Sequence, residues 1–127
     1  MDIGSEPALR VTAMPRDANA YGDIFGGWLM SQMDSAAGLV AARTARGRAV
    51  TVAVEGMTFL LPVKVGDEVS VFAKVVRTGR TSMSIAVEAW RRDRHQETAQ
   101  KVTAATFTFV AIGKDLKPRP LPSAQAD

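Results

Sequence analysis

The sequence predicts an α+β fold in which one long helix lies against an antiparallel sheet of five or six strands. A single helical pattern, expected over about residues 28–43, is followed by segments of alternating apolar and polar residues joined by short turns. The helical pattern is apolar on nearly every side, so its whole circumference needs cover. A sheet curled round the helix and completed by a second copy of the chain would provide that cover.

The expected elements follow one another in a simple order. Residues 9–14 form a first short strand that ends at Pro15, and a turn-rich loop leads to the helix, which Gly47 ends. After the helix, strands are expected over residues 49–61, 68–77, 81–90 and 98–112, and an extended proline-rich tail begins at Gly113. Residues 1–127 are expected to form a single domain, with flexible ends at 1–8 and 123–127.

The composition excludes several kinds of site. The chain has no cysteine, which rules out disulfides, thiol nucleophiles and cysteine-ligated zinc. Its single histidine, His95, lies in a polar run that favours a solvated loop, so neither a Ser-His-Asp triad nor a histidine metal site is expected. We therefore expect no metal and no cofactor.

Charge and hydropathy limit the partners. The formal net charge is +3, and the basic residues form short clusters rather than the dense stripe of a nucleic-acid-binding protein. Such clusters suit a small polyphosphate ligand, although solubility is the simpler explanation for any single basic residue. No apolar run reaches the roughly 18 residues of a membrane span, and no secretory signal is visible. We expect no nucleic-acid partner, no membrane partner and a cytoplasmic location.

A lone acidic residue, Asp34, stands in the middle of the apolar helix. Removing a carboxylate from water is costly unless it is paired, protonated or functional, which makes Asp34 a candidate catalytic base; a solvent-facing or capping role fits the pattern equally well. Gly26 and Gly27 stand where the helix begins, so unbonded N–H groups and the positive end of the helix dipole would face a ligand there. Such a site can polarise a carbonyl oxygen, although a tight turn needs the same glycines.

The spacing of these residues predicts a site shared between two subunits. Gly27 and Asp34 are seven residues apart, so they lie on nearly the same helix face. Their separation along the axis is about 10 Å, whereas a base and an oxyanion donor must each lie about 3 Å from the reacting atoms. One helix cannot easily supply both groups, but two antiparallel helices across a two-fold axis can.

Four blocks of the sequence resemble the YciA-like, or cytosolic, branch of the acyl-CoA thioesterases. The first block holds Asn19 and Gly22, then Phe25-Gly26-Gly27, then Asp34, in the family's order and spacing. The other blocks are residues 54–67, 78–84 and 117–122, so the resemblance covers roughly residues 10–122. Each block is modest alone, but the four in order are specific.

The resemblance implies a fold and an activity. The family has the hotdog fold, a long central helix wrapped by an antiparallel sheet. Its subunits pair as double-hotdog dimers, which commonly assemble further into hexamers as a trimer of dimers. Its reaction is the hydrolysis of an acyl-CoA thioester to a free carboxylic acid and CoA.

The resemblance also assigns roles to residues. Asp34 matches the family's base or nucleophile, Asn19 the residue that helps to hold water or the thioester, and Gly27 the oxyanion donor. Whether Asp34 activates water or attacks to form an anhydride stays open. The substrate-binding residues expected from the resemblance and from the apolar and basic side chains near its motifs are Gly26, Met57, Phe59, Leu60, Arg77, Gly79, Arg80, Thr81, Ser82, Lys117 and Arg119.

Other interpretations of the sequence are weaker. A non-enzymatic acyl-CoA sensor on the same fold would be favoured by loss of the acidic residue, which is present as Asp34. A hotdog dehydratase or hydratase would use a catalytic histidine, and His95 lies in the wrong kind of segment. A purely structural domain would leave Asp34 unexplained. Glu55 is a second carboxylate beside the motif, for which pairing with an arginine is the simpler role.

Overall fold

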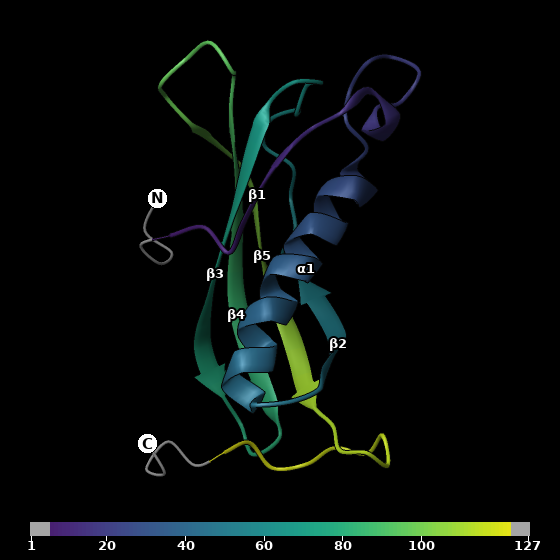
Figure 1. Cartoon of the computed structure of the whole chain (residues 1–127), viewed down its shortest axis with the longest axis vertical. Coiled ribbons are helices and arrows are strands. Elements are labelled where there is room, and N and C mark those ends of the chain that lie inside the picture. The colour runs from purple at the N-terminus through teal and green to yellow at the C-terminus, as the bar shows by residue number, and fades with distance from the viewer. Residues whose placement is uncertain (1–5, 123–127) are drawn as a thin grey trace.

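The computed structural model describes residues 6–122 and shows one helix lying across a five-stranded sheet (Figure 1). Every neighbouring pair of strands is antiparallel, and the strand order is β1-β3-β4-β5-β2. The predicted α+β arrangement is confirmed, with five strands. In chain order the elements are β1 (Leu9–Thr12), a 3₁₀ turn (Pro15–Asp17), α1 (Gly26–Ala45), β2 (Ala49–Glu55), β3 (Glu68–Thr78), β4 (Ser82–Arg92) and β5 (Gln100–Ala111).

Helix α1 packs one face against the inner side of the sheet. Small side chains on that face let the helix come close, and a Cβ at Gly38 would lie 3.9 Å from the ring of Phe109 on β5. The buried residues lie along one face of the helix, mostly at spacings of three or four positions. They are Leu29, Met33, Ala36, Ala37, Ala41 and Ala45.

The strands that face the helix alternate between buried and half-buried positions. In β4, Met83, Ile85 and Val87 are fully buried, whereas the residues between them reach the outer surface. The same period of two continues in β5, where Phe107 is fully buried. This is the pattern of an antiparallel sheet covered on one face only.

The ends of α1 and β2 differ from the predictions in informative ways. The left-handed residue that ends α1 is Arg46 (φ 53°), not Gly47. A Cβ at Gly47 would lie 2.6 Å from Arg119 Nη2, so the guanidinium would have to shift to make room for a side chain. Strand β2 ends at Glu55 rather than at residue 61, because Gly56 adopts φ 74° and turns the chain out of the extended conformation.

The prolines predicted an extended tail, but the tail also contains a turn. It turns over residues 114–117 and then returns to the end of the sheet. There Arg119 N donates to Ala111 O and Leu121 N donates to Arg80 O, each at 2.9 Å. The flexibility expected of residues 1–5 and 123–127 lies outside the described residues.

Part of the apolar surface stays uncovered in the single chain. On α1, Met30 and Leu39 are 40% and 46% exposed, and on the edge strand β2 the side chains of Val50, Val52 and Val54 are also exposed. The sheet therefore wraps only part of the helix. Within residues 6–122, no helix is long and apolar enough to cross a membrane.

Candidate active site

Asp34 lies on the flank of α1 beside the edge strand β2. Its Oδ1 accepts a hydrogen bond of 2.6 Å from Thr51 Oγ1. The residue is half-buried in the single chain, between the enclosed and the solvent-facing positions that the sequence left open, and the helix is open on this side. Because a carboxylate offers about four lone-pair positions, one bond from Thr51 orients Asp34 and leaves it able to accept a proton.

Sequence reasoning missed Thr51. Threonine is an ordinary residue in a strand, and 17 residues separate it from Asp34, so no local motif joins the two. The strand register provides the link, because Thr51 pairs with the inward-facing Phe109 just before a β-bulge. Alternation along β2 could have placed Thr51 on the helix side of the sheet, but not opposite Asp34.

The first turn of α1 begins at Gly26 and Gly27, as predicted. The side chain of the N-cap residue, Phe25, makes no capping hydrogen bond, so backbone N–H groups of this turn remain available to a ligand. A Cβ at Gly27 would meet nothing within 4 Å, whereas one at Gly26 would lie 3.2 Å from the ring of Phe59. The helix end is therefore open at Gly27 and closed by an aromatic ring at Gly26.

Asn19 belongs to the loop that leads into this helix end. Its Oδ1 accepts hydrogen bonds from the N–H groups of Tyr21 at 2.8 Å and Asp23 at 3.1 Å. Asp23 is in turn bonded to the Lys64 side chain, which ties the loop to the β2–β3 connection. Because the carbonyl oxygen of Asn19 is used inside the loop, its NH₂ group is the part that can donate to a ligand.

The three predicted catalytic residues do not converge within one chain. Asn19 belongs with Gly27 to the N-terminal end of α1, and Asp34 lies two helical turns further on, at about 10 Å for a rise of ~1.5 Å per residue. The flank that carries Asp34 borders the unpaired edge of the sheet, where a second chain has access.

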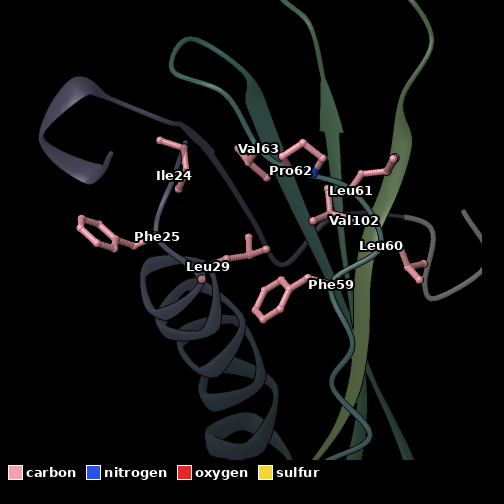
Figure 2. A pocket seen from close by; sticks show the side chains of 10 residues that line it. Ile24, Phe25, Leu29, Phe59, Leu60, Leu61, Pro62, Val63 and Val102 are labelled. Carbon is pink, nitrogen blue, oxygen red and sulfur yellow. The ribbon is translucent and has the colours of Figure 1, made fainter. Parts of the chain in front are cut away.

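An apolar cavity of about 370 Å³ opens beside the first turn of α1 (Figure 2). Three of the predicted substrate-binding residues, Gly26, Phe59 and Leu60, line it. Met57 does not line it and packs against the core instead. The remaining lining residues are Ile24, Phe25, Leu29, Leu61, Pro62, Val63 and Val102.

The other predicted substrate-binding residues lie at the opposite end of the molecule, near the C-terminal end of α1 (Figure 1). The β3–β4 turn, with Gly79 to Ser82, is held against the tail by the bond from Leu121 N to Arg80 O. Arg77 and Lys117 are exposed there.

Arg119 has structural partners in this region. Its Nη2 donates to Ala45 O at 2.9 Å and its Nε to Ile112 O at 3.1 Å. The guanidinium therefore caps the C-terminal end of α1, where carbonyl groups lack intrahelical partners and a cation is favoured.

Several other charged or titratable residues lie outside the candidate site. Arg92 bonds to Glu68 at 2.6 Å, which ties β4 to β3. His95 is exposed in the β4–β5 connection, as predicted. Glu55 lines a hollow on the outer face of the sheet together with Arg77. Across residues 6–122, no three His, Cys, Asp or Glu side chains are grouped as metal ligands would be.

Comparison with known proteins identifies relatives over nearly the whole chain. A family model described as "Thioesterase superfamily" matches residues 21–98. The acyl-CoA thioester hydrolase YciA of Salmonella typhimurium is 54% identical over 120 residues, which cover 92% of this chain and 90% of that protein.

Solved structures agree with this match. The hexameric thioesterase y2039 from Yersinia pestis superposes with a TM-score of 0.89 at 50% identity, covering 94% of this chain and 97% of that one. The hexameric hotdog fold thioesterase Cj0915 of Campylobacter jejuni gives a TM-score of 0.88 at 40% identity, covering 95% and 92%. The predicted hotdog fold is thereby confirmed.

Proposed function

Because this chain belongs to the thioesterase superfamily, we propose that it hydrolyses acyl-CoA thioesters to a free carboxylic acid and CoA. The observation that carries the proposal is Asp34, bonded to Thr51 on the open flank of α1, with the helix N-terminus at Gly27 on nearly the same face. A thioester carbonyl is electrophilic, so a carboxylate and an oxyanion site can suffice.

Two chemical routes would use these residues. In the first, Asp34 takes a proton from a water whose oxygen attacks the carbonyl carbon, and Gly27 N–H binds the resulting oxyanion. Collapse of the adduct breaks the C–S bond, and the proton passes to sulfur, which leaves as CoA thiol. In the second, an Asp34 oxygen attacks the carbonyl, the thiolate leaves, and water hydrolyses the mixed anhydride. Asn19 NH₂ holds the water or the carbonyl oxygen, and neither route draws on a metal or a cofactor.

A second copy of the chain completes the site in this proposal. The edge strand β2 is unpaired and carries exposed valines, and Met30 and Leu39 extend this apolar surface onto α1. Such an edge favours pairing with another chain. Two β2 strands paired about a two-fold axis would lay the helices antiparallel and bring Asn19 and Gly27 of one copy toward Asp34 of the other. The hexameric relatives support further assembly, as a trimer of dimers.

The same pairing accounts for the position of the basic residues. The β3–β4 turn (Gly79 to Ser82), Arg77 and Lys117 lie near the C-terminal end of α1. Antiparallel helices would place this end near the partner's helix N-terminus, so the phosphates of CoA would reach basic groups of the second copy. The cytoplasmic location and the lack of nucleic-acid and membrane partners stay predictions.

The test is thiol release from a panel of acyl-CoA esters by the wild type and by Asp34→Asn, a nearly isosteric change. We expect a loss of at least about 100-fold, the low end of general-base effects. Asp93→Asn is the matched control, because Asp93 Oδ1 only accepts the His95 N–H bond in an exposed turn, and Asn can accept the same bond. Acyl-CoA binding without turnover by the wild type would identify a sensor. Equal turnover by Asp34→Asn would remove Asp34 from the chemistry and direct attention to Glu55→Gln.

A further inference from the structure

The loop that carries Asn19 fixes the direction in which this side chain can act. Asn19 Oδ1 accepts the N–H bonds from Tyr21 and Asp23, and the backbone N–H of Asn19 donates to Asp23 O at 2.7 Å. Because the amide is planar, its NH₂ group points away from these donors, and turning the amide over would set N–H against N–H. The position of Asp23 therefore sets where the NH₂ group of Asn19 points.

Polar contacts, rather than packing, hold this loop in place. None of residues 14–23 is buried, and none of their apolar side chains packs against the core. Asp23 forms an antiparallel bridge with Lys64 of the β2–β3 connection, and the Lys64 ammonium donates to the Asp23 carboxylate. Next to this bridge, Ile24 N donates to Val63 O at 3.0 Å (Figure 2). The loop therefore takes its position from the β2–β3 connection.

The β2–β3 connection is in turn shaped by a buried carboxylate. Asp67 is 4% exposed, and among residues 6–122 it is the only acidic residue that is buried. Its Oδ2 accepts a hydrogen bond of 2.9 Å from Lys64 N, and its own N–H donates to Lys64 O at 3.0 Å. Ala13 N donates to Asp67 O at 3.0 Å, which ties this turn to the end of β1. Asp67 thus fixes the backbone from which the Lys64 side chain reaches Asp23.

Stability alone does not account well for this carboxylate. Burying a carboxylate is costly unless it is paired and fully hydrogen-bonded. The guanidinium that faces it, Arg91 Nη1, lies 3.6 Å from Oδ2, which is beyond hydrogen-bond distance. Arg91 Nε is buried and has no hydrogen-bond partner among residues 6–122. The shorter contact of Asp67 is with Lys64 N, so its main contribution is to the shape of the connection.

Building on the function proposed above, we infer that Asp67 and Lys64 are positioning residues for the reaction, although neither contacts the substrate. Asp67 holds the backbone of Lys64, and the Lys64 side chain holds Asp23. Asp23 in turn directs the Asn19 NH₂ group toward the water or the carbonyl oxygen. Such a group must be placed within about 0.5 Å of its working position, and misplacement by about 1 Å can slow the chemical step about 100-fold.

The experiment measures kcat and KM for thiol release with the acyl-CoA ester that the wild type hydrolyses fastest. Lys64→Met removes the ammonium and retains most of the side-chain length, whereas Lys64→Arg retains a cation for Asp23. Lys101→Met is the matched control, because it makes the same change at a lysine of β5 that pairs with Glu88 at 3.6 Å, away from the loop.

Variants of Asp67 test the buried end of the path. Asp67→Ala removes the acceptor of the Lys64 N–H bond, whereas Asp67→Asn keeps an oxygen that can accept this bond and loses only the charge. Glu68→Ala is the control, because it removes a carboxylate at the next residue, whose partner is Arg92 on β4. Thermal unfolding shows whether each variant is folded at the assay temperature, and the Lys64 variants decide the question if Asp67→Ala is not.

We expect losses in kcat with little change in KM, because the groups that bind CoA stay in place. Lys64→Met should lower kcat about three- to fivefold, the scale of an exposed ion pair, and Lys64→Arg should stay within about twofold of the wild type. Asp67→Ala should lower kcat at least about tenfold, and Asp67→Asn by less. Lys101→Met and Glu68→Ala should keep the wild-type values.

Double variants separate positioning from support of the fold. Asn19→Ala removes the NH₂ group on which both positioning residues act. Adding Lys64→Met or Asp67→Ala to Asn19→Ala should therefore lower kcat by less than about a further twofold. A contact that only supports the fold would lower kcat by its full factor in either background.

The outcomes that would overturn this assignment are distinct from failure of the proposed function. An active wild type whose kcat is unchanged in Lys64→Met, or in a folded Asp67→Ala, would refute the positioning role and leave the proposed function standing. Losses that multiply fully with that of Asn19→Ala, or wild-type kcat in Asn19→Ala itself, would have the same meaning. A wild type that hydrolyses no ester of the panel would refute the proposed function, and the positioning role with it.

Discussion

The hydrogen bond between Thr51 and Asp34 is the contact that most directly connects the fold to the proposed chemistry. Replacing Thr51 by valine keeps the β-branched shape and removes only the hydroxyl that donates to Asp34 Oδ1. Strand β2 should remain intact, because valine is at least as good a strand residue as threonine. The change therefore alters the position and solvation of one carboxylate.

The size of the effect follows from the kind of bond. A hydrogen bond to a charged group contributes about 1.5–3 kcal/mol in proteins. Asp34 is half-buried and Thr51 is exposed in the single chain, so water can replace part of the bond, and the lower value applies. If the bond holds Asp34 in its reactive position, a loss of about 1.5 kcal/mol corresponds to roughly tenfold in kcat.

The assay is steady-state thiol release with decanoyl-CoA, which separates kcat from KM. We expect Thr51→Val to lower kcat about tenfold with little change in KM, since the substrate itself loses no contact. Thr51→Ser retains the hydroxyl and should stay within about threefold of the wild type. Wild-type kcat in Thr51→Val, or equal losses in the two variants, would show that the bond does not position the catalytic carboxylate.

Two further predictions concern stability and assembly. Arg119→Ala should lower the free energy of unfolding in urea by about 2–3 kcal/mol, because the carbonyl groups of Ala45 and Ile112 lose a charged donor. The control Lys114→Ala, at an exposed position, should change this free energy by less than about 0.5 kcal/mol. Equal losses in the two variants would contradict the capping role of Arg119. Val52→Lys places a charge on the free edge of β2 and should reduce the molar mass of the assembly measured by light scattering, whereas Leu116→Lys in the tail loop should not. An unchanged molar mass for Val52→Lys would place the subunit interface elsewhere.

The regular elements could be predicted because their causes are local. The long run of small and apolar residues marks α1, and the period of two that marks β3, β4 and β5 arises from the face that each strand buries. The end of β2 was missed because residues 57–61 have strand-forming side chains, and a single glycine, Gly56, turns the chain away before them. A strand propensity summed over several residues does not reveal that the backbone of one residue, Gly56, adopts a positive φ.

The site was predictable only in part, for a related reason. The motif that joins Asn19, Gly27 and Asp34 is continuous in the sequence, so its residues could be named and its division between two chains could be argued from helix rise alone. Thr51 reaches Asp34 through strand register, and Arg119 reaches Gly47 and the helix end through the path of the tail. No spacing rule along one chain encodes contacts of that kind.

The cap on α1 has a consequence for how the chain is made. The carbonyl of Ala45 accepts a hydrogen bond from a guanidinium that follows it by 74 residues, so this part of the cap forms only when the tail has returned to the helix end. Contacts so distant along the chain form late in folding, because a long loop must be closed first. Until the tail has docked, the last turn of α1 would therefore rely on backbone bonds such as the one from Gly47 N to Ala42 O.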